Sequence, residues 1–167
     1  RRYMGLGATY DNGPLSLGLG GEQLSRDDSA TAAGDITTWS LGGSYDLGVA
    51  KLLAAYRQST VDRFAFATNG ADAKRKGYML AVTAPVGPGL VRAAYNRYQD
   101  SQTGVADAKA DHFAIGYVYS LSKRTSVYGT YAYLKNKNGG TRFSINGGAG
   151  LDNGKQQGLQ VGMTHAF

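Results

Sequence analysis

Cysteine is absent from the 167-residue sequence, and histidine occurs only twice. Without cysteine there is no disulfide frame, no thiol nucleophile and no thiolate metal site. With two histidines, a metal centre built on imidazole ligands is not expected either. We therefore predict neither a bound metal nor a cofactor.

Long apolar runs are also missing. The longest uncharged apolar segment, Gly77–Val91, is interrupted by proline and glycine, and it falls short of the roughly 18 residues of a membrane-spanning helix. Proline occurs three times and tryptophan once, whereas glycine occurs 25 times and tyrosine 12 times. So much glycine disfavours helices. Glycine together with tyrosine is typical of curved sheets with interfacial aromatic side chains.

Motifs of common catalytic sites do not occur. The glycine-rich stretches lack the Gly-Lys-Ser/Thr of a phosphate loop, and there is no serine nucleophile elbow or HExxH motif. The net charge is +6, but the basic residues are dispersed and only Lys74-Arg75-Lys76 forms a cluster. This pattern predicts no enzyme. It also predicts no nucleic-acid partner, because such binders gather their cations into one patch.

The last ten residues show a clear two-residue period. Successive side chains of a strand point to opposite faces of a sheet, and here apolar or aromatic residues alternate with small or polar ones. One face holds Leu159, Val161, Met163, His165 and Phe167, and the other holds Gln160, Gly162, Thr164 and Ala166. The segment is therefore predicted to be a strand with one apolar face that ends on an aromatic residue.

The same period recurs along the whole chain and predicts about nine strands, each near the roughly 9–11 residues that cross a membrane at a tilt. The predicted strands are Tyr3–Tyr10, Leu15–Glu22, Thr38–Asp46, Ala50–Arg57, Gly77–Ala84, Val91–Asn96, His112–Leu121, Thr125–Lys135 and Gly158–Phe167. Both faces of the eighth strand carry tyrosine, so its orientation stays open.

Short and long connections are predicted to alternate. The expected turns are Asp11–Pro14, Asp46–Gly48, Pro85–Gly89 and Ser122–Arg124, and the expected long loops are Ser25–Asp35, Ser59–Lys74, Gln99–Lys109 and Asn136–Asn153. A membrane barrel has short turns at one end and long loops at the other. Tyrosines near the strand ends fit an aromatic girdle at the headgroup level. A soluble sheet would need a second layer over its apolar face, and none is predicted.

Three segments resemble a known family. Tyr117–Thr125 is similar to a tyrosine-rich strand and its Leu-Ser-Lys-Arg-Thr turn, Leu159–Phe167 to a terminal strand, and Tyr10–Leu15 to a hairpin turn. Together they resemble the C-terminal half of a general diffusion porin of Gram-negative bacteria, of the beta-proteobacterial type. The resemblance implies an all-β, antiparallel transmembrane β-barrel in the cell outer membrane. Residues 1–167 would form one barrel domain that is incomplete at its N-terminus, because such porins have about sixteen strands.

The resemblance implies further properties. The whole protein would be a homotrimer in contact with outer-membrane lipid and lipopolysaccharide. The barrel-assembly machinery would recognise His165 and Phe167. The inward-folded third loop that narrows the pore of the family would lie outside this chain. Lys74-Arg75-Lys76, where a long loop enters a strand, either touches lipopolysaccharide phosphates or is a solvated loop edge.

The predicted function is passive diffusion of small anionic or neutral hydrophilic solutes and ions, without catalysis. On the inward parity we expect pore-lining residues: Lys51, Arg57, Arg92, Glu22 and Asn96. Cations along one wall lower the entry barrier for anions, although they would equally keep a lumen hydrated. Arg97 falls on the outward parity and is expected to reach the interface. Two alternatives stay open: a structural or adhesive outer-membrane barrel with partner-binding loops, and a soluble all-β binding module.

Overall fold

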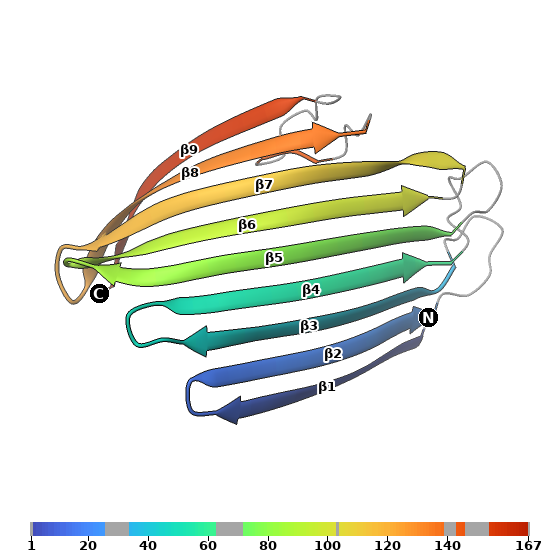
Figure 1. Cartoon of the computed structure of the whole chain (residues 1–167), viewed down its shortest axis with the longest axis horizontal. Coiled ribbons are helices and arrows are strands. Elements are labelled where there is room, and N and C mark those ends of the chain that lie inside the picture. Colours follow the sequence, from blue (N-terminus) through green and yellow to red (C-terminus); the bar gives the residue numbers. More distant parts are fainter. Residues whose placement is uncertain are drawn as a thin grey trace.

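Nine strands form one antiparallel sheet in strict chain order (Figure 1). The structure is a computed structural model that describes residues 2–25, 34–62, 72–102, 104–138, 143–145 and 154–166. The strands are β1 (Arg2–Asn12), β2 (Leu15–Ser25), β3 (Ile36–Asp46), β4 (Lys51–Val61), β5 (Ala73–Val86), β6 (Gly89–Gln102), β7 (Val105–Ser120), β8 (Thr125–Lys137) and β9 (Lys155–His165). The predicted all-β antiparallel architecture with about nine strands is confirmed. Within these residues no helix has the length and apolarity to cross a membrane.

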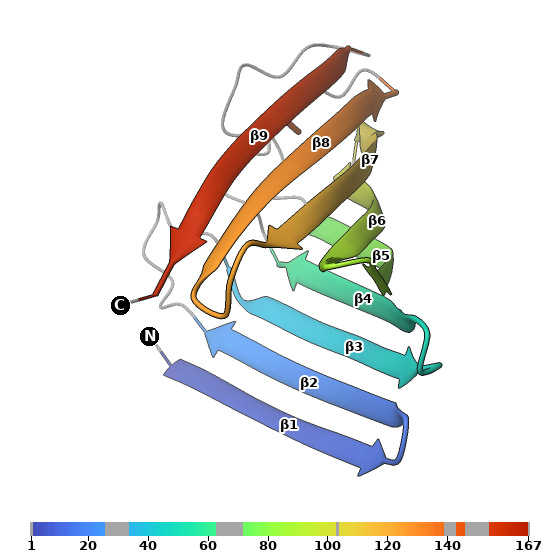
Figure 2. The same cartoon turned by 90° about the vertical axis from the view of Figure 1, so that its left-hand side faces the viewer.

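The sheet curls into an open trough with β1 and β9 as its two edges (Figure 2). Short turns close four hairpins at one end, which we call the turn end, and the opposite end is the loop end. At the turn between β3 and β4, Gly48 has a φ of +81° and its N–H donates to the Asp46 carboxylate at 2.8 Å. A positive φ is readily adopted by glycine, so this turn has a local sequence cause.

One predicted long loop is wrong. Residues 99–109 are mostly strand, because β6 continues to Gln102 and β7 begins at Val105. Gly104, with a φ of +79°, lies in the tight connection between them. The Gln99 side chain donates to Asp107 across the hairpin at 2.8 Å. Here the outward positions Gln99, Asp107 and Lys109 are polar, whereas Ala108 is buried on the concave face. The outward apolar residues that mark a membrane strand are therefore missing, and the connections do not strictly alternate in length.

The register of the eight strand pairs sorts the side chains into two faces, as predicted. The convex face carries the large apolar residues, and their side chains are exposed: Leu80 is 62% exposed and Leu159 is 78% exposed. In β8 the register places Tyr131 and Tyr133 on this face and Tyr128 on the concave face, which settles the open orientation. Soluble monomers rarely expose a continuous apolar surface of this extent.

Aromatic rings border the apolar surface at both ends. Near the loop end, Trp39, Tyr56 and Tyr78 form a ladder with ring centroids 4.7 and 4.8 Å apart. At the turn end, Tyr117 and Tyr119 lie with centroids 6.4 Å apart. Such amphipathic rings favour the two membrane–water interfaces. The two groups therefore mark the upper and lower limits of a lipid-facing band.

The height of the band agrees with a bilayer. The apolar residues run from Phe113 on the outward face of β7 to Leu121, which directly follows the strand and is 57% exposed. This segment covers about 27 Å of extended chain, or about 21 Å along the membrane normal at a tilt of about 40°. The band also shifts between strands: the cross-strand row that holds Leu19 and Leu41 in β2 and β3 holds Arg97 and Lys155 in β6 and β9. This shift is expected of tilted strands, because a membrane plane then cuts each strand at a different row.

Candidate channel lining

All five residues predicted to line a pore lie on the concave face. The register gives them the same orientation: Lys51, Arg57, Arg92, Glu22 and Asn96. They do not form one cluster. Glu22 and Arg57 meet near the loop end, Lys51 and Arg92 share a row near the turn end, and Asn96 lies between the two rows. Small or neutral residues such as Ser40 and Ala94 fill the wall around them.

The loop-end group is an exposed ion pair. Arg57 Nη2 lies 3.4 Å from Glu22 Oε1, and the hydroxyl of Tyr3 donates to the other Glu22 oxygen at 2.9 Å. The side chain of Arg57 is 67% exposed, so it remains accessible to anions in the solvent. Because exposed pairs of this kind are weak, Glu22 reduces the local positive charge without removing the guanidinium from the solvent path.

A third inward arginine, Arg75, was not predicted. Arg75 Nε lies 3.5 Å from Asp100 Oδ2, and the register places both on the concave face. The predicted loop ended at Lys74 and the predicted fifth strand began at Gly77, which left Arg75 between the two. In the structure Lys74-Arg75-Lys76 lies inside β5, so its residues alternate: Arg75 points inward, and Lys74 and Lys76 point outward.

The turn-end group differs in having few nearby carboxylates. Lys51 and Arg92 flank Thr83 in one cross-strand row. The carboxylate of Asp46, which pairs in register with Lys51, is engaged by the Gly48 N–H. No carboxylate of the described residues forms an ion pair with Arg92. Arg92 is therefore the inward cation whose charge is least compensated.

The concave wall as a whole is balanced in charge. The strand residues on this face include four cations, Lys51, Arg57, Arg75 and Arg92, and four acids, Asp11, Glu22, Asp46 and Asp100. The net charge of +6 therefore does not arise from this wall. Any preference for anions must come from how the four cations are placed and paired.

A short segment of the predicted last loop lies against the same wall. The buried amide of Asn136 donates to the carbonyl of Phe143 at 2.9 Å, and Gln156 accepts the N–H of Ile145 at 2.8 Å. The ring of Phe143 stacks on Tyr98 at 5.5 Å. The loop Asn136–Asn153 was predicted to lie outside the strands, without a contact to the concave wall. The sequence offered one signal of this contact, the two amide side chains of Asn136 and Gln156, which can hydrogen-bond the backbone of a segment lying against the wall.

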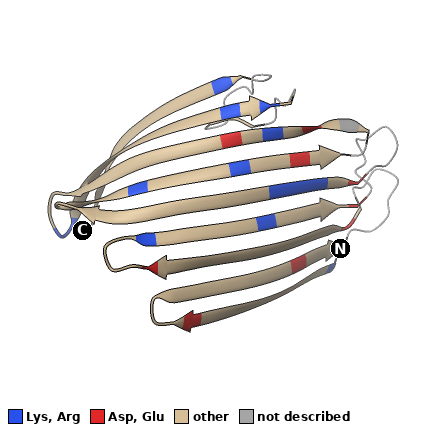
Figure 3. Ribbon diagram, in the orientation of Figure 1, with Lys and Arg blue, Asp and Glu red and all other residues tan. Residues whose placement is uncertain are grey.

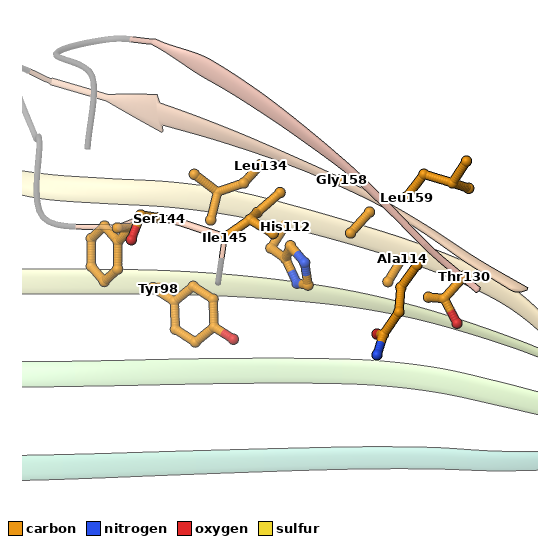
Figure 4. Close-up of a pocket in the computed structure, with 12 residues that line it drawn as sticks. Tyr98, His112, Ala114, Thr130, Leu134, Ser144, Ile145, Gly158 and Leu159 are labelled. Atoms are coloured by element: carbon orange, nitrogen blue, oxygen red, sulfur yellow. The ribbon is translucent and has the colours of Figure 1, made fainter. Parts of the chain in front are cut away.

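Residues 143–145 reshape the wall beneath them. They border a cavity of about 530 Å³ together with His112 and Leu134, and Figure 4 shows Ile145 beside these side chains. His112 Nδ1 lies 3.3 Å from the Asn96 amide, so Asn96 is held in place. A neighbouring hollow of about 970 Å³ reaches from Phe143 to Arg57 and Arg75. The concave wall is therefore stepped and partly aromatic.

The predicted assembly signal lies apart from this wall. His165 is the last residue of β9 and faces outward, where its Nδ1 lies 2.8 Å from the Thr125 hydroxyl. Phe167 lies outside the described residues. The contact ties the end of β9 to the start of β8, which is a structural role compatible with recognition.

Comparison with known proteins agrees with this arrangement. The profile of a family described as Gram-negative porin matches residues 1–139. Outer membrane porin protein 32 of Delftia acidovorans is 42% identical over 99% of this chain and 46% of its own length. The solved structure of an anion-selective porin from Comamonas acidovorans superposes with a TM-score of 0.83 at 40% identity, covering 99% of this chain and 49% of the other.

A more distant structure shares the fold. The trimer form of OmpT, an outer membrane protein of Vibrio cholerae, is 16% identical and superposes with a TM-score of 0.70 over 96% of this chain and 54% of its own. The chain thus spans about half the length of the proteins it matches. A curved antiparallel sheet with a lipid-compatible outer band and a polar inner wall, together with the family match over most of its length, identifies this chain as a member of the Gram-negative porin family, an outer-membrane β-barrel protein.

Proposed function

We propose that this chain is the C-terminal part of a larger barrel that acts as a passive diffusion channel for small hydrophilic solutes and ions, with a preference for anions and without catalysis. Residues 1–167 form one barrel domain, and the strands that close it precede them. We call the closed protein the complete barrel. Two unpaired edge strands support this proposal, because open sheet edges are not tolerated in lipid. The relation to a porin named anion-selective supports the choice of ion.

The conducting function is tested in planar bilayers. The complete barrel should give stepwise, ohmic conductance, and a salt gradient should give a reversal potential displaced toward the anion. In liposomes it should also admit a small sugar, with swelling of the vesicles. Cation selectivity would contradict the charge argument. Conductance without swelling would limit the channel to ions, and neither signal would favour a closed structural or adhesive barrel.

Reversing the charge of Arg92 should weaken the anion preference. Arg92→Glu changes the wall by two charges, and a charge about 8 Å from an ion in water changes its energy by about 0.5 kcal/mol. Because the reversal disfavours chloride and favours potassium by about 1 kcal/mol each, we expect the ratio of chloride to potassium permeability to fall about 30-fold. The control is Lys155→Glu, which makes the same change on the convex face and should leave the ratio within experimental error. Equal effects of the two variants would show that position on the wall does not matter.

Removing the charge of Glu22 should have the opposite effect and strengthen the anion preference. Glu22→Gln leaves a hydrogen-bonding side chain beside Tyr3 but releases Arg57 from its ion pair. The permeability ratio should rise about sixfold, by the same Coulomb argument for one charge acting on both ions. Reversal potentials at low and high salt should differ, because screening weakens the effect of an exposed charge. A lower permeability ratio would mean that the released Arg57 forms an ion pair with another carboxylate.

The assembly of the protein is a further part of the proposal. We propose a homotrimer in the outer membrane, supported by the trimer form of a structurally similar barrel. His165 and Phe167 then serve as the signal read by the barrel-assembly machinery. Truncating Phe167 should lower the yield of folded protein in cells, whereas refolding of the purified chain into detergent should be unaffected. A loss in both assays would instead indicate a role in stability alone.

A further inference from the structure

The segment 143–145 covers part of the concave wall and is held there at three points. The Asn136 amide binds its first residue, and the Gln156 side chain binds the N–H of Ile145. The third point is Gly158, where an added Cβ atom would lie 3.2 Å from Ile145 Cγ2. Glycine therefore lets Ile145 pack directly on β9. Because both ends of the segment are fixed to strands, the cavity beneath it is preformed, as most small-molecule sites are.

This cavity suits the ring of a small solute. Its volume of about 530 Å³ lies within the range of ligand sites in proteins. Apolar surface comes from Phe143, Ile145 and Leu134, of which Leu134 is only 4% exposed. Figure 4 shows Tyr98 and His112 beside the same space. We call it the apolar cavity. Its lining favours an aromatic ring over a hydrated ion.

A cationic hollow adjoins the apolar cavity. The hollow of about 970 Å³ shares Tyr98 and Phe143 with the cavity, and it is also lined by Arg57 and Arg75. We call it the arginine hollow. Figure 3 shows basic positions on the neighbouring strands β4 and β5 toward the loop end. The planar guanidinium group matches the geometry of a carboxylate, so the hollow offers a carboxylate partner beside an aromatic wall.

The two arginines face the solvent although each has an acidic neighbour. The closest approaches are 3.4 Å to Glu22 and 3.5 Å to Asp100, each through one nitrogen atom. A guanidinium has five N–H donors, so further donors remain for a solute. The side chains of Arg57 and Arg75 are 67% and 56% exposed, whereas Asp100 is 7% exposed. An entering carboxylate therefore meets the guanidinium groups and not the buried acid.

One cross-strand row sets the distance between charge and ring. The row runs from Arg57 through Gly77 to Tyr98. Gly77 has no side chain, and a Cβ built there has one neighbouring atom within 4 Å, Tyr98 Cδ1 at 3.9 Å. Strands lie about 4.8 Å apart, so the Cα atoms of Arg57 and Tyr98 are about 10 Å apart. A solute whose ring packs against Tyr98 can thus place a carboxylate, one or two bonds from the ring, near Arg57.

We propose that the apolar cavity and the arginine hollow form one binding site for small carboxylates that carry an aromatic ring. The ring lies in the cavity beside Tyr98 and Phe143, and the carboxylate faces Arg57 and Arg75. The inference rests on the proposed function, because it takes the concave face as the wall of a water-filled channel. It goes beyond selection by charge, since solutes of equal charge are separated by their apolar part.

The test measures phenylacetate binding to the complete barrel in detergent by equilibrium dialysis, with protein-free micelles as the blank. Acetate carries the same charge without the ring, and benzyl alcohol carries the ring without the charge. Phenylacetate should bind saturably and about tenfold more tightly than either, because ring burial and a charge-assisted contact both contribute. Equal binding of acetate or of benzyl alcohol would overturn the proposal, since one half of the site would then suffice.

Variants locate the site on the wall. Phe143→Ala should weaken phenylacetate binding about fivefold, the contribution of one aromatic contact, and leave acetate binding unaffected. Arg57→Gln should weaken it about threefold, as expected for an exposed charge. Gly77→Val fills the gap between Arg57 and Tyr98 and should weaken it as well. It provides a second test that leaves segment 143–145 intact.

Arg92→Gln is the matched control for Arg57→Gln. It removes the same charge from the same wall but lies nearer the turn end, outside the lining of both hollows. It should lower the ratio of chloride to potassium permeability and leave phenylacetate binding unchanged. Equal losses of phenylacetate binding in the two arginine variants would overturn the proposal. A barrel that conducts without binding phenylacetate would contradict the site alone, and one that binds without conducting would contradict the channel alone.

Discussion

Replacing Leu80 with arginine is expected to destabilise the complete barrel by about 2–3 kcal/mol, because a basic residue on the lipid face costs about 2–4 kcal/mol at the bilayer midplane and less toward the interfaces. Leu80 is on the convex face of β5 and is 62% exposed. In a water-soluble sheet an exposed position of this kind would accept arginine with little change in stability. The measurement is urea unfolding in phospholipid vesicles, with the folded fraction read from gel mobility.

The matched control is Ala81→Arg, one residue further along the same strand. Ala81 faces the concave wall, between Leu53 and Ala94, where an arginine can extend into water. Its free energy of unfolding should differ from that of the natural sequence by less than about 1 kcal/mol. Equal losses at the two positions would contradict the division of β5 into a lipid face and a water face.

Replacing Gly89 with alanine is expected to destabilise the barrel by about 1–3 kcal/mol through overpacking. A Cβ atom at this position would lie 2.3 Å from the carbonyl oxygen of Val118 and 2.6 Å from the Tyr117 ring. That ring crosses the glycine so that its hydroxyl can donate to the Val86 carbonyl at 2.8 Å. Because a backbone oxygen is the nearest obstacle, the β6–β7 pairing would have to shift.

Gly18→Ala serves as the control for Gly89. No heavy atom lies within 4 Å of a Cβ built on Gly18, so the added methyl group meets open space. Alanine lowers the backbone freedom of the unfolded chain, and stability should stay the same or rise by up to about 1 kcal/mol. Unfolding of both variants in vesicles would show the difference. If Gly89→Ala were as stable as Gly18→Ala, the close approach of Tyr117 would not constrain the fold.

The faces of the strands could be predicted from the sequence because lipid and water impose opposite preferences on alternate residues. Leu80, Ile115 and Val161 all follow this rule, and all are exposed on the convex face. The rule fails where a strand leaves the membrane. At residues 99–109 the outward positions are polar and the apolar Ala108 is buried on the concave face, so the outward apolar residues disappear although the backbone pairing continues.

Other features depend on contacts that no local pattern encodes. Arg75 was missed as a lining residue because its strand begins before the apolar residues of β5 do. The position of Phe143 depends on contacts with Tyr98 of β6 and Asn136 of β8, which lie on two separate strands. The distribution of charge also required the register. The inward parity of Lys51, Arg57 and Arg92 predicted a positively charged pore wall, whereas the register places the excess of strand cations on the convex face.

Spin labels placed at neighbouring positions test the central claim directly, because they report whether each side chain meets hydrocarbon or water. Cysteine introduced at Leu80, Ile115 or Val161 of the complete barrel in vesicles should give labels that collide with dissolved oxygen and are shielded from a water-soluble nickel chelate. Labels at the adjacent residues Ala81, Ala114 and Gln160 should show the reverse. Equal exposure to the chelate on both sets of positions, or labels immobilised by protein on the first set, would contradict the account.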